Sequence, residues 1–169
     1  MLTHLYLCAM DLEEFRKNAA ASEEKNKKLF AKLKRTKPKD LDKQVHQLHE
    51  EAFERIDCLT CANCCKTTSP IFYQKDLERA AKHLRISPSQ FLQTYLHMDE
   101  DGDFVLNEAP CPFLGSDNYC SIYESRPAAC REYPHTDRKK VVQIMDLTMK
   151  NTMVCPAVLD IAEKLREIY

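Results

Sequence analysis

The spacing of apolar residues in the first third of the chain predicts two helices joined by a short link. Residues 11–35 are rich in strong helix formers and contain neither proline nor glycine, which favours one long helix. Residues 40–56 carry apolar side chains at helical spacing, which predicts a second helix with one apolar face. Pro38 separates the two, because a residue before proline avoids the helical region. We therefore expect a helical hairpin within residues 1–56.

Three further helices are predicted beyond this hairpin. Residues 74–85 place apolar side chains at helical spacing. Ser87, Pro88 and Gln90 form a helix start, with serine as the N-cap, proline at the first helical position and glutamine at the third. Pro156 takes the same early position and predicts a helix at the C-terminal end of the chain.

The rest of the chain predicts short elements and loops. Residues 109–135 combine prolines, cysteines and aromatic residues, which favours loops ordered around a metal. A short strand is expected at 104–106, and residues 141–147 fit either a strand or a helical turn. Only two glycines occur, Gly102 and Gly115, which argues against an all-β fold with many tight turns. The expected fold is mainly α, with short strands and cysteine-bearing loops.

Composition adds limits to this picture. Charged residues make up 30% of the chain and the formal net charge is −1, which predicts a soluble surface without a global nucleic-acid signature. No apolar run approaches the roughly 18 residues of a transmembrane helix. The apolar opening, residues 1–10, lacks the basic region and cleavage site of a signal peptide, so we interpret it as structure. We expect a cytoplasmic protein without membrane contact, with the hairpin at 1–56 and a second domain at 57–169.

Nine cysteines change the interpretation most. Their number is odd, no export signal accompanies them, and a disulfide between the neighbours Cys64 and Cys65 would be strained. Metal ligation therefore explains them better than disulfides do. Cys8 lies far from the others and is interpreted as a plain buried thiol. The candidate ligands are Cys58, Cys61, Cys64, Cys65, Cys111, Cys120, Cys130 and Cys155.

The spacing of these cysteines points to more than one metal centre. Cys58, Cys61 and Cys64 are separated by two residues each, so three sulfurs from one short loop can face a common centre. Cys65 adds a sulfur that points in another direction, which predicts two centres or a bridging thiolate. Eight thiolates complete two four-cysteine sites. Thiolate is the ligand that both zinc and iron–sulfur clusters prefer, so the spacing leaves the metal open.

Five segments together carry a resemblance to a known family: Cys58-Leu-Thr-Cys61-Ala-Asn-Cys64-Cys65, Cys111-Pro-Phe-Leu114, Cys120-Ser-Ile-Tyr-Glu-Ser-Arg-Pro127, Cys130-Arg-Glu-Tyr-Pro134 and Cys155-Pro156. This pattern resembles the CxxCxxCC proteins, also called the YkgJ family, over residues 57–157. The resemblance implies an eight-cysteine domain that chelates zinc or iron, with a [4Fe–4S] iron–sulfur cluster as the expected cofactor and Zn²⁺ as the alternative. One departure is Ala62-Asn63, where the family has glycine in the loop.

Residues around the cysteines add a charge argument. Arg126 and Arg131 flank Cys130, and positive side chains near thiolates offset the negative charge of a four-thiolate site. We therefore expect both arginines to contribute to cofactor binding. His135 follows the same block of cysteines and is a weaker candidate for a further, non-thiolate ligand.

Three functions remain open at this stage. The first is a redox or cluster-dependent iron–sulfur protein, and a related domain in flagellin lysine methylases implies that an enzyme is one form of it. The second is a zinc-stabilised binding module that contacts RNA or a protein through residues 25–39, which hold eight basic side chains and no acidic one. The third is a metal carrier. No nucleophile–base pair, nucleotide loop or methyl-donor motif stands out, so the sequence assigns no reaction.

Overall fold

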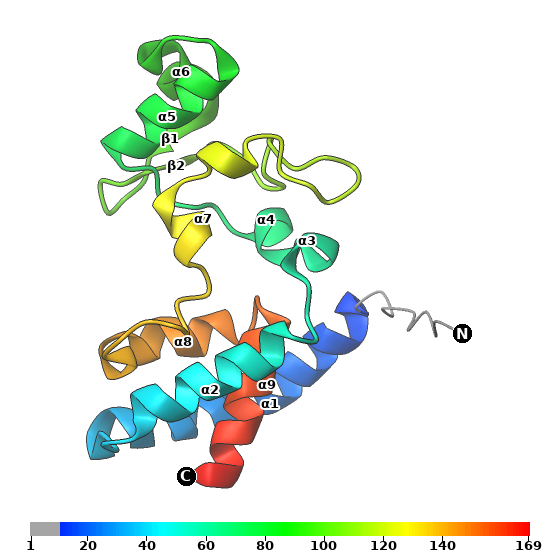
Figure 1. The fold of residues 1–169 in the computed structure, drawn as a ribbon, viewed down its shortest axis with the longest axis vertical. Helices are drawn as coiled ribbons and strands as arrows, with labels where there is room; N and C mark the ends of the chain where they lie inside the picture. The colour runs from blue at the N-terminus through cyan, green and yellow to red at the C-terminus, as the bar shows by residue number, and fades with distance from the viewer. Residues whose placement is uncertain (1–10) are drawn as a thin grey trace.

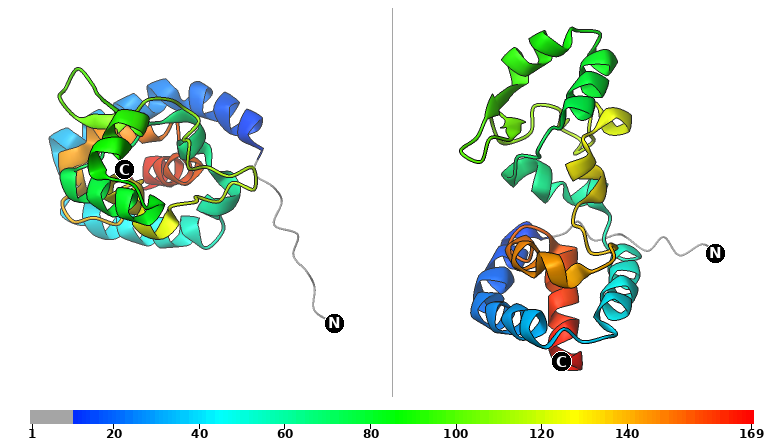
Figure 2. Two further views of the ribbon diagram at one scale, coloured as in Figure 1. Left: turned by 90° about the horizontal axis from the view of Figure 1, so that it is seen from above. Right: turned by 90° about the vertical axis from the view of Figure 1, so that its left-hand side faces the viewer.

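The computed structural model describes residues 11–169, and the fold is mainly α as predicted (Figure 1). The interpretations of the apolar opening and of Cys8 lie outside the described residues. The chain forms two lobes joined by a narrower waist, and the right-hand view of Figure 2 shows the same separation from the side. Within residues 11–169 no helix combines the length and the apolar character that a transmembrane span requires.

The lower lobe in Figure 1 consists of four helices and a short 3-10 turn. These are α1 (Leu12–Thr36), α2 (Leu41–Phe53), η2 (Val141–Ile144), α8 (Met145–Asn151) and α9 (Pro156–Ile168). Helix α9 packs against both α1 and α2, while α8 packs against α1. Leu33, Val45 and Ile161 are among the buried residues of their common core. The two predicted N-terminal helices therefore form, and their apolar faces are covered largely by helices from the other end of the chain.

Local chemistry explains where α1 begins and ends. The Asp11 carboxylate accepts hydrogen bonds from the backbone N–H groups of Glu13 and Glu14, at 2.9 and 3.1 Å. At the other end Lys37 takes a left-handed conformation with φ of 47°, and Pro38 follows it. The helix therefore stops where the sequence predicts.

The upper lobe contains two helices and a small antiparallel sheet. Its elements are α5 (Gln74–Leu84), α6 (Pro88–Tyr95), β1 (Leu96–Met98) and β2 (Phe104–Leu106). The predicted helix start is confirmed, because the Gln90 N–H donates to the Ser87 hydroxyl at 3.1 Å. Strand β1 was not predicted, and it pairs with β2 so that Leu96 lies opposite Leu106. Phe91 is buried in the core of this lobe, where it packs against Phe72 among aliphatic side chains.

The waist, residues 57–70 and 107–135, joins the lobes. It contains α3 (Cys58–Cys61), α4 (Asn63–Thr67), η1 (Tyr123–Ser125) and α7 (Ala128–Glu132), with loops between them. Seven of the eight candidate cysteines lie in the waist, and the eighth, Cys155, immediately precedes α9 in the lower lobe. The fold thus places every candidate ligand in or beside the waist. The division of the chain at residue 56 stays a prediction.

Candidate metal centre

Helix α3 and the residue after it set the geometry of the first cysteines. Cys58 and Cys61 stand at the two ends of one helical turn, so their side chains share a face. The Asp57 carboxylate caps this turn by accepting from the Leu59 N–H at 2.9 Å. Ala62 then links α3 to α4 in a left-handed conformation, with φ of 48° and ψ of 17°. This is the conformation that glycine adopts without steric cost, whereas the Cβ of an L-residue is strained in it.

The neighbouring thiols of Cys64 and Cys65 diverge along α4. Their sulfurs are 4.0 Å apart, and no disulfide joins them. Successive side chains on a helix are rotated by about 100°, and each of the two thiols has its own further neighbours. Cys64 lines a small cavity with Cys58, Cys61 and Cys155, whereas Cys65 lies near Cys111, Cys120 and Cys130.

The first thiol group consists of Cys58, Cys61, Cys64 and Cys155. These four residues line one small cavity of about 20 Å³, together with Tyr133 and a few apolar residues. Asn63 closes the group across the fold, because its side-chain amide donates to the carbonyl of Val154 at 2.7 Å. That bond fixes the α3–α4 segment against the residue that precedes Cys155.

The second thiol group consists of Cys65, Cys111, Cys120 and Cys130. The pKa of Cys130 is raised first by burial and then by the charges of Cys65, Cys111 and Cys120, so these three thiols lie within electrostatic range of Cys130. Cys65 in turn contributes to the raised pKa of Cys111 and of Cys120. The backbone agrees with this grouping, since the Cys111 N–H donates to the Cys65 carbonyl at 2.8 Å. An isolated antiparallel β-bridge pairs the backbones of Leu114 and Cys120, so the segment 111–120 folds back on itself.

Comparison with known families agrees with the motif. The model of the CxxCxxCC family, described as a putative zinc- or iron-chelating domain, matches residues 57–156. The chain belongs to this family. The matched range covers more than half of the chain and contains all eight cysteines of the two thiol groups. No curated protein and no solved structure matches the chain.

A buried carboxylate positions the second thiol group of the CxxCxxCC domain. Asp76, at the start of α5, accepts from the Arg79 guanidinium at 2.6 Å and from the Ala128 N–H at 3.2 Å. Arg79 also donates to the carbonyl of Arg126 at 2.7 Å. These bonds hold the first turn of α7, the helix that carries Cys130. Sequence reasoning missed Asp76, although an acidic residue at the third position of a predicted helix is a recognisable signal.

Burial sets the protonation of the thiols before any metal binds. Desolvation raises the pKa of Cys111 to about 11 and the pKa of Cys130 and Cys155 to about 12. Cys65 behaves differently, because the hydrogen bond between its sulfur and that of Cys64 lowers the pKa of Cys65. Most of these thiols are therefore protonated at neutral pH, and a metal must displace their protons in order to bind.

The thiol groups contain the donor atoms of a metal centre, but their sulfur atoms do not converge on a single point. In residues 11–169 no three Cys, His, Asp or Glu side chains converge as they would on one ion. Tetrahedral zinc, with Zn–S bonds of about 2.3 Å, needs sulfurs about 3.8 Å apart. The four-thiol donor set of each group is nevertheless the set that structural zinc and iron–sulfur clusters take. The residues present therefore fit either cofactor by their chemistry.

The two predicted arginines occupy different environments. Arg126 stacks on the ring of Tyr123, 3.7 Å from its centroid, and its charge lowers the pKa of Cys120 and Cys130 against the dominant effect of burial. It is therefore near enough to the second thiol group to offset negative charge there. Arg131 lies on α7 with an exposed side chain. Its contribution to cofactor binding stays a prediction.

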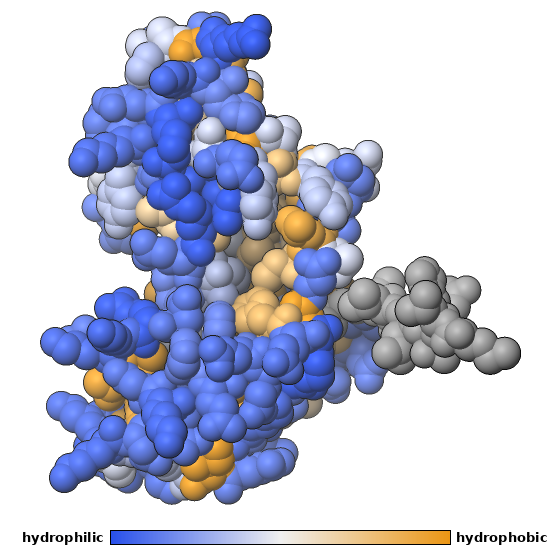
Figure 3. Space-filling view, in the orientation of Figure 1, coloured by the Kyte–Doolittle hydropathy of each residue, from blue (hydrophilic) through white to orange (hydrophobic). Residues whose placement is uncertain are grey.

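A larger cavity of about 320 Å³ opens beside both thiol groups. Cys64 from the first group and Cys65 and Cys111 from the second contribute to its wall. His135 also lines it, and burial lowers the pKa of this imidazole, which favours the neutral form. Figure 3 shows apolar surface gathered at the waist between the two hydrophilic lobes. The sequence pattern contained no signal for this cavity, because its walls come from four separate segments of the chain.

Proposed function

We propose that the CxxCxxCC domain holds two metal centres, each bound by one four-thiol group, and that [4Fe–4S] clusters are their occupants. The observation that carries the proposal is the division of the eight thiols into two groups of four, on the two sides of the Cys64–Cys65 pair. Four cysteine thiolates are the ligand set of a [4Fe–4S] cluster. A cytoplasmic setting, in which free thiols stay reduced, agrees with this function.

Two features favour clusters over zinc. The local run of Cys58, Cys61 and Cys64, two residues apart, is the spacing with which bacterial ferredoxins bind a cluster. The surroundings of the second group are apolar, with Phe113 and Ile122 only 5% and 1% exposed. An apolar shell that limits solvent is one of the features by which proteins tune a redox centre.

When bound, the clusters would supply one-electron transfer, and the chain's own residues would set the conditions for it. The thiols would bind as thiolates, with Arg126 offsetting negative charge at the second centre. The side chains of the waist would limit the access of water. We therefore propose a redox or cluster-dependent role for the domain.

Anaerobic purification followed by metal analysis tests this proposal. A brown protein with about eight iron and eight acid-labile sulfide per chain is expected, as two [4Fe–4S] clusters require. Cys61→Ala and Cys130→Ala should each remove about half of the iron, because each breaks one group. A colourless protein with stoichiometric zinc would exclude the clusters, and a protein that binds neither metal would exclude thiol ligation altogether.

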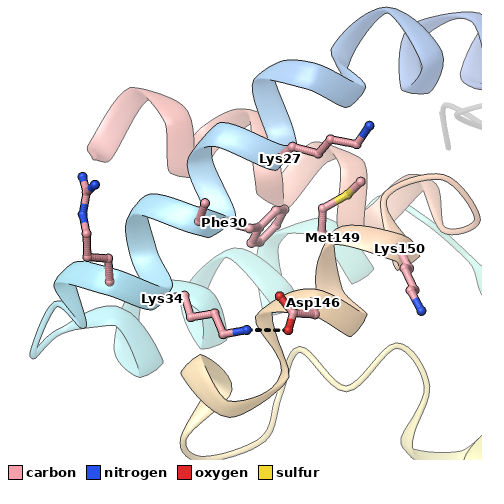
Figure 4. A pocket seen from close by; sticks show the side chains of 8 residues that line it. Lys27, Phe30, Lys34, Asp146, Met149 and Lys150 are labelled. Carbon is pink, nitrogen blue, oxygen red and sulfur yellow. Dashed lines mark hydrogen bonds and ion pairs between the residues drawn. The ribbon is translucent and has the colours of Figure 1, made fainter.

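A groove on the lower lobe favours a second candidate function, a zinc-stabilised module that binds a partner. The groove lies between α1 and α8 and has a volume of about 560 Å³ (Figure 4). Its lining combines basic and apolar side chains, and includes Lys27, Phe30, Lys34, Arg35, Met149 and Lys150. Most of its basic residues belong to the predicted contact segment 25–39.

The chemistry of the groove fits an acidic protein segment better than RNA. Lys27 already pairs with Glu23 and Glu24, and Lys34 pairs with Asp146, so the positive charge is partly neutralised. Phe30 is only 3% exposed and therefore offers no open ring face on which a base can stack. An acidic segment with an apolar side chain would contact both the basic and the apolar side chains that line the groove.

Binding measurements on the zinc-loaded protein separate the two partners. An Arg35→Glu and Lys150→Glu double variant should lose affinity for a poly-glutamate peptide, measured by fluorescence anisotropy, while Lys43→Glu on α2 should not. Stronger binding of the wild type to poly-uridine than to the peptide would favour RNA. Equal binding by all three proteins would remove the groove as a contact surface.

A further inference from the structure

Tyr133 carries a buried hydroxyl for which the described residues provide no hydrogen-bond partner. The residue follows the end of α7, and its backbone N–H donates to the carbonyl of Ala129 at 3.1 Å. Pro134 comes next and is buried, so the backbone is restrained on both sides. A buried polar group without a partner is costly, and each such group calls for a physical explanation.

The surroundings of the hydroxyl point to the first thiol group. Tyr133 lines the small cavity that Cys58, Cys61, Cys64 and Cys155 also line. Burial is the main cause that raises the pKa of the phenol. A phenol with its ordinary pKa of about 10 is already protonated at neutral pH, so the hydroxyl is available as a donor.

Tyr133 also forms a boundary between two spaces. Its side chain contributes to the small sulfur-lined cavity on one side and to the cavity of about 320 Å³ on the other. Tyr133 shares this position between the cavities with Cys64, which also lines both. The hydroxyl adds something that a phenylalanine ring at this position would lack, which is a proton to donate.

We propose that the Tyr133 hydroxyl donates a hydrogen bond to the metal centre held by Cys58, Cys61, Cys64 and Cys155, at a thiolate sulfur or a cluster sulfide. This inference rests on the proposed metal-binding function and deepens it. The bond stabilises negative charge on the centre, as partners that contact the ligands of a metal site do. The negative charge of the two centres is then offset in different ways. A neutral hydrogen-bond donor offsets it at the first centre, and the guanidinium of Arg126 offsets it at the second.

The variant Tyr133→Phe tests the inference, because it keeps the ring and removes only the donor. Wild type and variant are loaded with metal, and loss of metal to a chelator is followed as two phases, one for each centre. Loss of a partner that contacts metal ligands typically weakens metal affinity about 10–100-fold. We expect at least a tenfold change in one phase and none in the other, with equal metal content at saturation.

Tyr95→Phe is the matched control. Tyr95 is another half-buried tyrosine, whose ring packs against Phe91 in the upper lobe and against Phe113 in the waist, at centroid distances of 5.1 and 4.9 Å. Removal of the Tyr95 hydroxyl should leave both phases of metal loss unchanged. If the centres are iron–sulfur clusters, Tyr133→Phe should also shift one of two reduction potentials to a more negative value, because the reduced and more negative state loses its donor.

The outcomes separate this inference from the function on which it rests. Absence of bound metal in both wild type and variant would overturn the proposed function itself. Equal metal content with both phases unchanged would leave the proposed function standing and overturn the role of Tyr133. A change of both phases together would assign Tyr133 a general structural role, which also contradicts the inference.

Discussion

At position 62 the backbone adopts a conformation that few L-residues tolerate. Ala62 has a φ of 48° and is only 3% exposed, and it serves at once as the end of α3 and the start of α4. A left-handed conformation costs an L-residue roughly 1–2 kcal/mol. The directions of the sulfurs on either side of it depend on this one residue.

We expect substitutions of Ala62 to follow backbone sterics rather than side-chain hydrophobicity. Ala62→Val should lower the free energy of unfolding of the loaded protein by about 2 kcal/mol, because a β-branched residue is strongly disfavoured at positive φ. Ala62→Gly should raise it by up to about 1 kcal/mol. Urea denaturation measures both. Ala80→Gly, in the interior of α5, is the control and should be destabilising; equal stability of the Val and Gly variants at 62 would contradict the prediction.

The raised pKa values of the buried thiols predict a pH dependence at the same scale. In the metal-free protein the pKa of Cys130 and Cys155 stands at about 12, against an ordinary value of 9.0, so the folded state prefers the protonated thiol. Their contribution to stability is present below pH 9.0 and is lost as the pH rises towards about 12.

Metal binding has the opposite dependence, because each displaced proton raises the apparent affinity about tenfold per pH unit. Chelator competition measured across neutral pH should show that the apparent affinity for metal rises with pH. Thermal unfolding of the metal-free protein should show that its stability falls as the pH rises above 9. The fall should be less steep for the Cys155→Ala variant. An affinity that stays constant with pH would mean that the thiols are already ionised.

At the scale of elements, α7 depends on α5 for its position. The helix has only five residues, Ala128–Glu132, and therefore gains little stability from its own hydrogen bonds. Asp76 and Arg79 hold its first turn from the upper lobe. Cys130 consequently reaches the second thiol group through contacts with a helix some 50 residues earlier in the chain.

Replacing Asp76 by asparagine should therefore disturb one centre more than the other. Asp76→Asn removes a buried charge that pairs with Arg79, and we expect a loss of about 2–3 kcal/mol in the free energy of unfolding. Metal content should fall mainly at the second thiol group, as measured by metal analysis in the Asp76→Asn protein. Glu78→Gln, on the exposed side of α5, should change stability by less than about 0.5 kcal/mol. Equal loss from both centres would contradict the role of Asp76.

At the scale of the whole molecule, the two lobes and the waist differ in what stabilises them. The lower lobe has an extensive apolar core shared by α1, α2, α8 and α9, and the upper lobe has a smaller apolar core. The waist consists largely of short helices and loops around the thiols. Metal that binds there also stabilises the segments that supply its ligands.

Removal of metal should therefore loosen the waist while the lower lobe stays folded. After treatment with a chelator, amide hydrogen exchange should accelerate strongly in residues 57–70 and 107–135, and change little in α2 and α9. Much of the far-ultraviolet circular dichroism should remain, because the long helices lie in the lower lobe. Exchange that accelerates equally in α9 would show that the lobe does not fold independently of the metal.

Local sequence chemistry was enough to predict most helices and the candidate ligands. The cap at Ser87 and the proline at the start of α9 act on their own neighbours, so their effect can be read from a few residues. The cysteine motif likewise identified the thiols without a structure. Strand β1 was missed because three residues carry little pattern, and a strand is stabilised mainly by its partner.

Only the tertiary structure decided which thiols belong together. Asn63 meets the carbonyl of Val154 across 91 residues, and this contact brings Cys155 to the first thiol group rather than the second. The apolar stripes of α1 and α2 likewise predicted buried faces but not that α9 would cover them. Periodicity tells which side of a helix is buried, whereas the partner depends on the packing of the whole chain.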